Sequence, residues 1–237
     1  MSPKLPLWGA LVVGSGLFLG IYWLFYGVGL PLWGDDSFLP PSSLGSHFVF
    51  KAVLFAASLV LMAMDRRPWR AFGWQRPAAM KWHWVWASGL GLGALTTLLI
   101  LITPAQGHPL LKAAGLGEII LVIWIWSSLT EEVFTRGLLQ TWTRVGSSSS
   151  LVSRPILASA LVFGAMHLSL LSIGTDGWTV AIIVTATTAL GLLAGIHRQS
   201  SDSLLPAILV HVAFNVGGLM AGIFWTLSQG NLNSDVL

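Results

Sequence analysis

The sequence predicts an all-α membrane protein: a polytopic bundle of about seven transmembrane helices, within a range of roughly six to eight. Of its 237 residues, 54% are hydrophobic and only 9% are charged, and the mean hydropathy is +0.77. Soluble domains carry roughly 25% charged residues, so this chain could not cover a surface that faces water. Its apolar runs are long enough to cross a hydrocarbon core, which takes about 20 helical residues. The runs are continuous, which argues against a β-barrel, whose strands alternate.

Charged residues, prolines and glycines divide the sequence into seven apolar segments, which we interpret as one integral membrane domain over residues 1–237. In chain order, the expected helices cover about 6–30, 46–64, 84–103, 118–143, 155–172, 178–197 and 203–228. The first segment follows Lys4 and is too long for the apolar region of a signal peptide. Because no clear small-residue cleavage site closes it, we expect it to be retained as a helix.

Each of the other six segments meets a charged or turn residue at one end, which justifies its boundary. In chain order, these boundary residues are Arg66, Lys81, Arg144, Arg154, Arg198 and Ser203. Most of them are basic, so the orientation in the membrane can be predicted by counting Lys and Arg on each side.

The distribution of Lys and Arg predicts that the N-terminus is cytoplasmic and the C-terminus is outside. With this orientation, the inner side receives nine basic residues: Lys4, Arg66, Arg67, Arg70, Arg76, Lys81, Arg144, Arg154 and Arg198. The outer side receives only Lys51 and Lys112, which we expect near helix ends, and Arg136 lies within the fourth segment. We expect the protein in the bacterial cytoplasmic (inner) membrane.

The composition also excludes several classes of function. The net charge of +3 comes from short loops rather than from a basic stripe with interleaved aromatic residues, so we expect no nucleic-acid partner. The chain has no cysteine, which excludes disulfides, thiolate catalysis and Cys-ligated zinc. Many of the 13 tryptophans lie at segment ends, where indole rings prefer the headgroup level. Membrane lipid is therefore the first expected partner.

A few polar and ionisable residues lie inside the segments, in the motif-bearing core at about 118–228. Such residues are costly in a bilayer and are functional candidates by default. They are Glu131, Glu132 and Arg136 on the fourth segment, His167 on the fifth, and His211 and Asn215 on the seventh.

These polar residues share one depth in the predicted membrane. Measured from the inner ends of their segments, Glu131 and His167 both lie 13 residues deep, and His211 and Asn215 lie eight and twelve residues deep. At 1.5 Å per residue, these positions lie roughly 12–20 Å from the cytoplasmic boundary. Scattered structural polar groups would have no reason to share a depth, so we expect the side chains to converge on one site.

The spacing within each segment predicts which polar side chains pair with each other and which face the site. Glu132 and Arg136 are four residues apart with the acid first, the geometry of an intrahelical ion pair. His211 and Asn215 have the same spacing and share a helix face. Glu131 points about 100° away from Glu132, so we expect Glu131 to face the site with the histidines and Asn215.

A glutamate, two histidines and an asparagine can support hydrolysis by two routes. The carboxylate can act as a general base on water while His and Asn donors stabilise an oxyanion. Alternatively, imidazoles and a carboxylate can hold a Zn²⁺-like ion that acidifies the water. The same groups could also relay protons in a coupled transporter, although the sequence shows no internal repeat of the kind many carriers have. As a third alternative, they could join helices in a non-enzymatic protein.

Three short motifs carry a family resemblance. They read EEVFTR at 131–136, FGAMH at 163–167 and HVAFN at 211–215. In this order, on three membrane helices, they resemble the EExxxR, FxxxH and HxxxN signature of the CPBP family of intramembrane proteases, also called the Abi or CaaX-protease-like family. The resemblance implies that Glu131 activates the water and that His167 helps to hold it.

The remaining roles follow from the same resemblance. It implies that His211 and Asn215 bind the oxyanion or join a metal, and that Glu132 and Arg136 organise the site. If a divalent metal such as zinc is present, its ligands would be Glu131, His167 and His211. We prefer the metal-free glutamate route, because Asn215 is a poor zinc ligand but a good amide donor to an oxyanion.

The resemblance further implies an intramembrane endopeptidase whose substrate is a peptide or a membrane-anchored protein. Relatives trim CaaX-like tails, mature bacteriocins or cleave C-terminal sorting signals. The alternatives to this function are a non-enzymatic immunity or scaffold protein and a proton-coupled transporter.

Overall fold

The computed structural model describes residues 7–24, 44–78, 80–105, 115–144, 150 and 152–229. Within these ranges the chain is mainly helical and contains no strand, which confirms the all-α prediction. Five of the helices are long and apolar enough to cross a membrane. They are α3 (Leu44–Met64), α4 (Trp82–Ile102), α9 (Arg154–Met166) with its 3₁₀ extension η5 (His167–Ile173), α10 (Gly177–Ser201) and α11 (Leu204–Ser228).

Two further apolar helices bring the bundle to seven over the described part of the chain, as the sequence predicts. One is α1 (Leu7–Tyr22). The other, called the central helix below, covers 116–143 and alternates between α- and π-helical hydrogen bonding. Its parts are α6 (Leu116–Glu118), η3 (π, Ile119–Ser127), α7 (Ser128–Glu132), η4 (π, Val133–Leu139) and α8 (Gln140–Thr143).

The helix boundaries agree with the predicted segments to within a few residues, which is the usual uncertainty of helix ends. The first segment was expected over about 6–30. Its α-helix ends at Tyr22, and residues 25–30 lie outside the described part of the chain.

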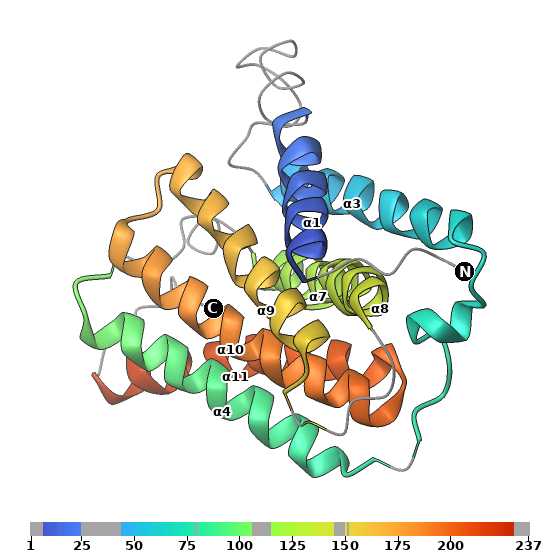
Figure 1. Cartoon of the computed structure of the whole chain (residues 1–237). Coiled ribbons are helices and arrows are strands. Elements are labelled where there is room, and N and C mark those ends of the chain that lie inside the picture. Colours follow the sequence, from blue (N-terminus) through green and yellow to red (C-terminus); the bar gives the residue numbers. More distant parts are fainter. Residues whose placement is uncertain are drawn as a thin grey trace.

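The central helix lies in the middle of the bundle, between α1 and α3 on one side and α9, α10 and α11 on the other (Figure 1). From Ser127 to Thr143 nearly all of its side chains are buried. In a helical bundle, the element that is covered on all sides is the one that can carry polar groups away from lipid. The fold therefore shields the residues of the EEVFTR motif.

Helices α4 and α11 pack together along most of their length because small residues let the two backbones approach. A side chain at Gly93 would collide with the carbonyl oxygen of Phe214, and one at Gly217 would collide with the backbone of Leu90. Phe214 lies between the polar residues of the HVAFN motif. This close contact therefore fixes the part of α11 that carries His211 and Asn215.

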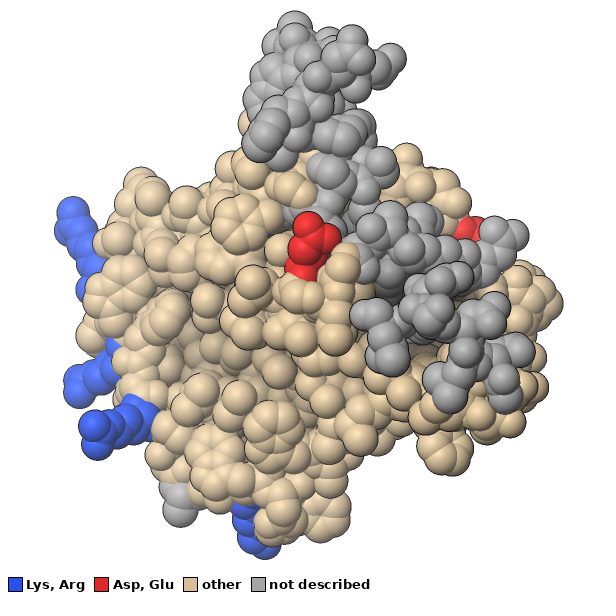
Figure 2. All heavy atoms as spheres, turned by 180° about the vertical axis from the view of Figure 1, so that it is seen from behind, with Lys and Arg blue, Asp and Glu red and all other residues tan. Residues whose placement is uncertain are grey.

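Basic side chains gather at one end of the bundle, as the count of Lys and Arg predicts (Figure 2). The segment between α3 and α4 is bound to two helices at this end: Arg67 donates to the carbonyl of Thr141 in α8 over 3.3 Å, and Arg198 of α10 donates to that of Ala71 over 3.0 Å. A hydrogen bond from Arg67 holds the pKa of the Asp65 carboxyl below its ordinary value. That this end is cytoplasmic stays a prediction.

Candidate active site

Two adjacent carboxylates, Glu131 and Glu132, lie on α7 between the two π segments of the central helix. They are buried, with 4% and 0% of their surfaces exposed. π segments are rare and are frequent at functional sites, because they change the direction in which successive side chains point. Each carboxylate makes its own set of contacts.

Glu132 forms the ion pair that its spacing predicts. Its Oε1 atom accepts a hydrogen bond from Nη1 of Arg136 over 3.1 Å, and both side chains are completely buried. The same oxygen also accepts from Nδ1 of His211 over 3.0 Å. Because a paired carboxylate only accepts hydrogen bonds, Nδ1 of His211 carries the hydrogen. In neutral His211, the other ring nitrogen, Nε2, is then an acceptor.

Glu131 has two differently placed oxygens. Its Oε1 atom accepts from the ammonium group of Lys51 and, over 2.9 Å, from the hydroxyl of Ser127. Its Oε2 atom lies 3.8 Å from Nε2 of His211. This separation is too long for a direct hydrogen bond, and one water molecule can bridge it. His211 therefore lies between the two glutamates.

Lys51 lies deeper than we expected. We expected it near the outer end of its helix, whereas only 5% of its surface is exposed and its ammonium group contacts Glu131. The signal that could have found it is depth. Lys51 lies 13 residues before Met64, the last residue of α3, and Glu131 lies 13 residues before Arg144. The two groups thus lie at the same level of the bundle.

His167 is the first residue of η5, where α9 ends. Its Nδ1 atom lies 2.9 Å from the carbonyl oxygen of Phe163, so Nδ1 donates the hydrogen and Nε2 is left as an acceptor. His167 is close enough to interact electrostatically with Glu131, and no hydrogen bond joins these two side chains. It thus borders the site without contacting the carboxylate directly.

The ring of Phe163 explains the aromatic position of the second motif. It packs edge-to-face against His167 and His211, with centroid distances of 5.1 and 5.4 Å. The guanidinium of Arg136 lies 4.5 Å from the centre of the same ring. A cation over an aromatic face is stabilised by the ring quadrupole. One buried ring therefore fixes three of the polar residues relative to one another.

Asn215 contacts the central helix through Ser128. Its Nδ2 atom donates to the hydroxyl of Ser128 over 3.2 Å, and it makes no hydrogen bond to Glu131. The second hydrogen on Nδ2 is available to a ligand. Asn215 lies one turn from His211 on α11, so both face the carboxylate pair from the same side.

The expected metal ligands do not assemble into a metal site. Among the described residues, no three His, Asp or Glu side chains lie where they could hold a metal ion together. The ammonium of Lys51 and the hydroxyl of Ser127 occupy Oε1 of Glu131, and Nδ1 of His211 is bound to Glu132. A positive charge for Glu131 is thus supplied by the chain itself.

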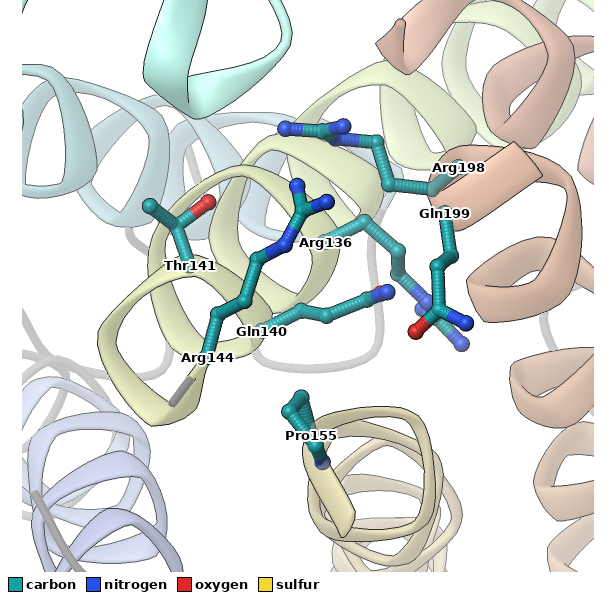
Figure 3. A pocket seen from close by; sticks show the side chains of 7 residues that line it. All are labelled: Arg136, Gln140, Thr141, Arg144, Pro155, Arg198 and Gln199. Atoms are coloured by element: carbon teal, nitrogen blue, oxygen red, sulfur yellow. The ribbon is translucent and has the colours of Figure 1, made fainter. Parts of the chain in front are cut away.

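A hollow lies where Arg136 approaches Arg144 and Arg198 (Figure 3). Its walls come from the central helix and from α9 and α10, and Arg136 reaches it from the buried cluster. The residues that line it are Arg136, Gln140, Thr141, Arg144, Pro155, Arg198 and Gln199. Glu131 and His211 are not among them. The hollow is thus distinct from the buried group in which Glu132 contacts Arg136 and His211.

The cluster has the components of a hydrolytic centre. A buried carboxylate, acceptor nitrogens on two imidazoles and an amide donor come from the central helix, η5 and α11. The positive charges of Lys51 and Arg136 balance the two carboxylates, so the group as a whole can exist inside an apolar bundle.

Comparison with known proteins supports the resemblance that the three motifs indicate. Residues 114–217, somewhat under half of the chain, match the family model described as type II CAAX prenyl endopeptidase Rce1-like. All three motifs lie within the matched residues. Neither a search of curated proteins nor a search of solved structures found a match. The part of the sequence that carries the three motifs is therefore similar to the Rce1-like endopeptidases, which are of the CPBP type.

Proposed function

We propose that the protein is a glutamate-dependent intramembrane endopeptidase that uses Glu131 as its general base. One observation supports this most strongly: the two oxygens of Glu131 are not equivalent. Lys51 and Ser127 hold Oε1, while Oε2 lies 3.8 Å from the acceptor nitrogen of His211. A water between them would donate to both atoms and keep its lone pairs free for attack.

The reaction then follows from these positions. Glu131 takes a proton from the water, and the hydroxide adds to the carbonyl carbon of the scissile peptide bond. The free N–H of Asn215 donates to the oxyanion that forms. When the C–N bond breaks, the proton on Glu131 passes to the leaving amine, which completes the hydrolysis. His167 helps to hold the water, and the Glu132–Arg136 pair keeps His211 in its tautomer.

The depth of the site favours a substrate that is itself anchored in the membrane. Glu131 lies about 20 Å, along the helix, from the basic end of the bundle, and it is 96% buried. A soluble peptide would have to leave water completely to reach it. We therefore propose that the substrate is the C-terminal tail of a membrane-anchored protein, of the CaaX type to which the name of the family refers.

Cleavage in proteoliposomes tests this proposal. The purified protein would be reconstituted with a prenylated CaaX peptide, with the same peptide lacking its lipid, and with a helix-anchored peptide that bears a C-terminal sorting signal. We expect cleavage of a membrane-anchored substrate and a loss of about 10²–10⁴-fold in Glu131→Gln, the usual contribution of a general base. Glu118→Gln is the matched control, because Glu118 is exposed at the outer end of the central helix.

Several outcomes would contradict the proposal. If Glu131→Gln cleaves as fast as the parent, Glu131 is not the general base. Loss of cleavage on chelation, with rescue by Zn²⁺, would favour the metal route. If none of the three peptides is cleaved, a transporter or a scaffold becomes the better interpretation, and proton flux across the same liposomes separates those two.

A further inference from the structure

Two phenylalanines on the same face of α3 as Lys51 pack this face against the central helix. Phe48, Lys51 and Phe55 are spaced by three and four residues and therefore share this face. The ring of Trp126 packs against both phenylalanines, at centroid distances of 5.1 and 5.5 Å. Its Nε1 atom also donates to the carbonyl of Phe48 over 3.2 Å. These contacts fix the register in which Lys51 meets Glu131.

The contacts of Lys51 act on one oxygen only. The ammonium and the hydroxyl of Ser127 both bind Oε1 of Glu131. Two donors on the same oxygen fix the rotation of the carboxylate, because turning it would exchange Oε1 with the unbound Oε2. The orientation of Oε2 toward His211 is thus a result of what binds Oε1.

Lys51 is the cation in direct contact with Glu131. The Nη1 atom of Arg136, the other cation of the cluster, is bound instead to Glu132 and to the hydroxyl of Thr135. Removing one partner of a buried pair leaves an uncompensated charge in an apolar environment. Without Lys51, Glu131 would therefore lose the positive charge bound to it.

We propose that Lys51 is the positioning residue of the general base: its ammonium compensates the charge of Glu131 in the middle of the bundle and directs Oε2 toward the attacking water. In this arrangement a lysine from α3 takes the place that a metal cation has in many other hydrolytic sites. The inference rests on the proposed function, since it assigns to Lys51 a part in the same reaction.

Steady-state kinetics in proteoliposomes test this role with four variants. Lys51→Met removes the charge but keeps most of the side-chain volume, and Lys51→Arg keeps the charge. Lys81→Met is the matched control, because Lys81 is an exposed lysine just before α4. Lys51→Met/Glu131→Gln removes both charges and shows whether the bundle folds without the pair.

We expect kcat of Lys51→Met to fall by about 10²-fold, near the lower limit of a general-base contribution, while KM stays within about twofold. Lys51→Arg should recover a large part of kcat, and Lys81→Met should match the parent. If Lys51→Met does not fold, Lys51→Gln replaces it, since glutamine can donate to Oε1 without a charge. A structural role alone would reduce the amount of folded protein without separating kcat from KM.

The outcomes separate this inference from the proposed function. Suppose that the parent cleaves the peptide and Glu131→Gln does not. Full kcat in Lys51→Met would then overturn the role of Lys51 and leave the proposed function intact. An equally low kcat in Lys51→Arg and Lys51→Met would also overturn the role of Lys51, because restoring the positive charge would then not restore activity. A parent that cleaves none of the peptides would contradict the proposed function, and this role with it.

Discussion

The molecule contains two groups of charged side chains in very different surroundings. At the basic end, Arg144 pairs with Asp202 over 3.0 Å, with about half of each side chain exposed. In the middle of the bundle, the Glu132–Arg136 pair is equally short, at 3.1 Å, and is completely buried. In water, such a pair contributes little, because solvent screens both charges whether or not they meet. In an apolar interior each charge depends on its partner. Similar geometry thus implies a replaceable contact in one region and an indispensable one in the other.

The largest expected effect lies in the buried group. Arg136→Ala leaves Glu132 without its cation and should cost ~3–5 kcal/mol of stability. Thermal unfolding in detergent, compared with the parent, measures this. The double variant Glu132→Gln/Arg136→Ala removes both charges and should recover part of the loss. An Arg136→Ala protein as thermostable as the parent would show that burial does not distinguish the two regions.

An uncharged member of the buried group sharpens the comparison. Asn215→Ala should lower kcat by about 10²–10³-fold, the usual effect of losing an oxyanion donor. It should cost only ~0.5–1.5 kcal/mol of stability, because a single neutral hydrogen bond is lost. Ser128→Ala is the matched control, since it removes the same hydrogen bond and keeps the amide. If both variants lose activity equally, the amide acts only through Ser128.

The loop at the basic end should respond to pH through Asp65. Besides Arg67, this carboxylate accepts from the indole of Trp142 over 2.7 Å. Its pKa is lower in the folded protein than in the unfolded chain, chiefly because of the hydrogen bond from Arg67. The resulting stability is therefore complete above about pH 4, the unfolded pKa of Asp, and is lost as the pH falls further.

Comparison of the parent with Asp65→Asn checks this prediction. The parent should be more stable by about 1.5–3 kcal/mol at neutral pH, the value of hydrogen bonds to a charged group. That advantage should shrink in melts below about pH 4. An advantage that stays constant down to pH 3 would mean that the carboxylate charge does not stabilise the loop.

The smallest effect is expected for the exposed pair. Replacing Arg144 by Gln, Asp202 by Asn, or both, should reveal a coupling of only ~0.2–1 kcal/mol in a double-mutant cycle. Added salt should reduce it further, because exposed charges are screened. A coupling as large as that of Glu132 and Arg136 would remove the distinction between the two regions.

The sequence predicted the all-α fold and the Glu132–Arg136 ion pair, because both depend on local patterns. Hydropathy placed seven segments, and the i,i+4 spacing of Glu132 and Arg136 predicted their ion pair. The π segments were not predictable, since they depend on hydrogen bonding that tertiary packing selects. The position of His211 between the two glutamates was not predictable either, because it depends on how α11 packs against α7.

Lys51 was missed for a related reason. A single lysine seven residues after the start of a helix resembles a side chain that reaches the interface. Only its partner on another helix shows that it points inward. The partner could have been sought by depth, as His167 and His211 were, but Lys51 belongs to none of the three motifs.

The tight contact of α4 with α11 has a mechanical consequence for a site that is closed. Backbones that touch at Gly93 and Gly217 cannot slide or separate without losing the whole interface, so the two helices form one rigid wall. His211 and Asn215 are mounted on that wall, although α4 supplies no residue to the cluster. We therefore expect a substrate of the proposed reaction to enter by displacing the opposite side of the bundle, while α4 holds α11 in place.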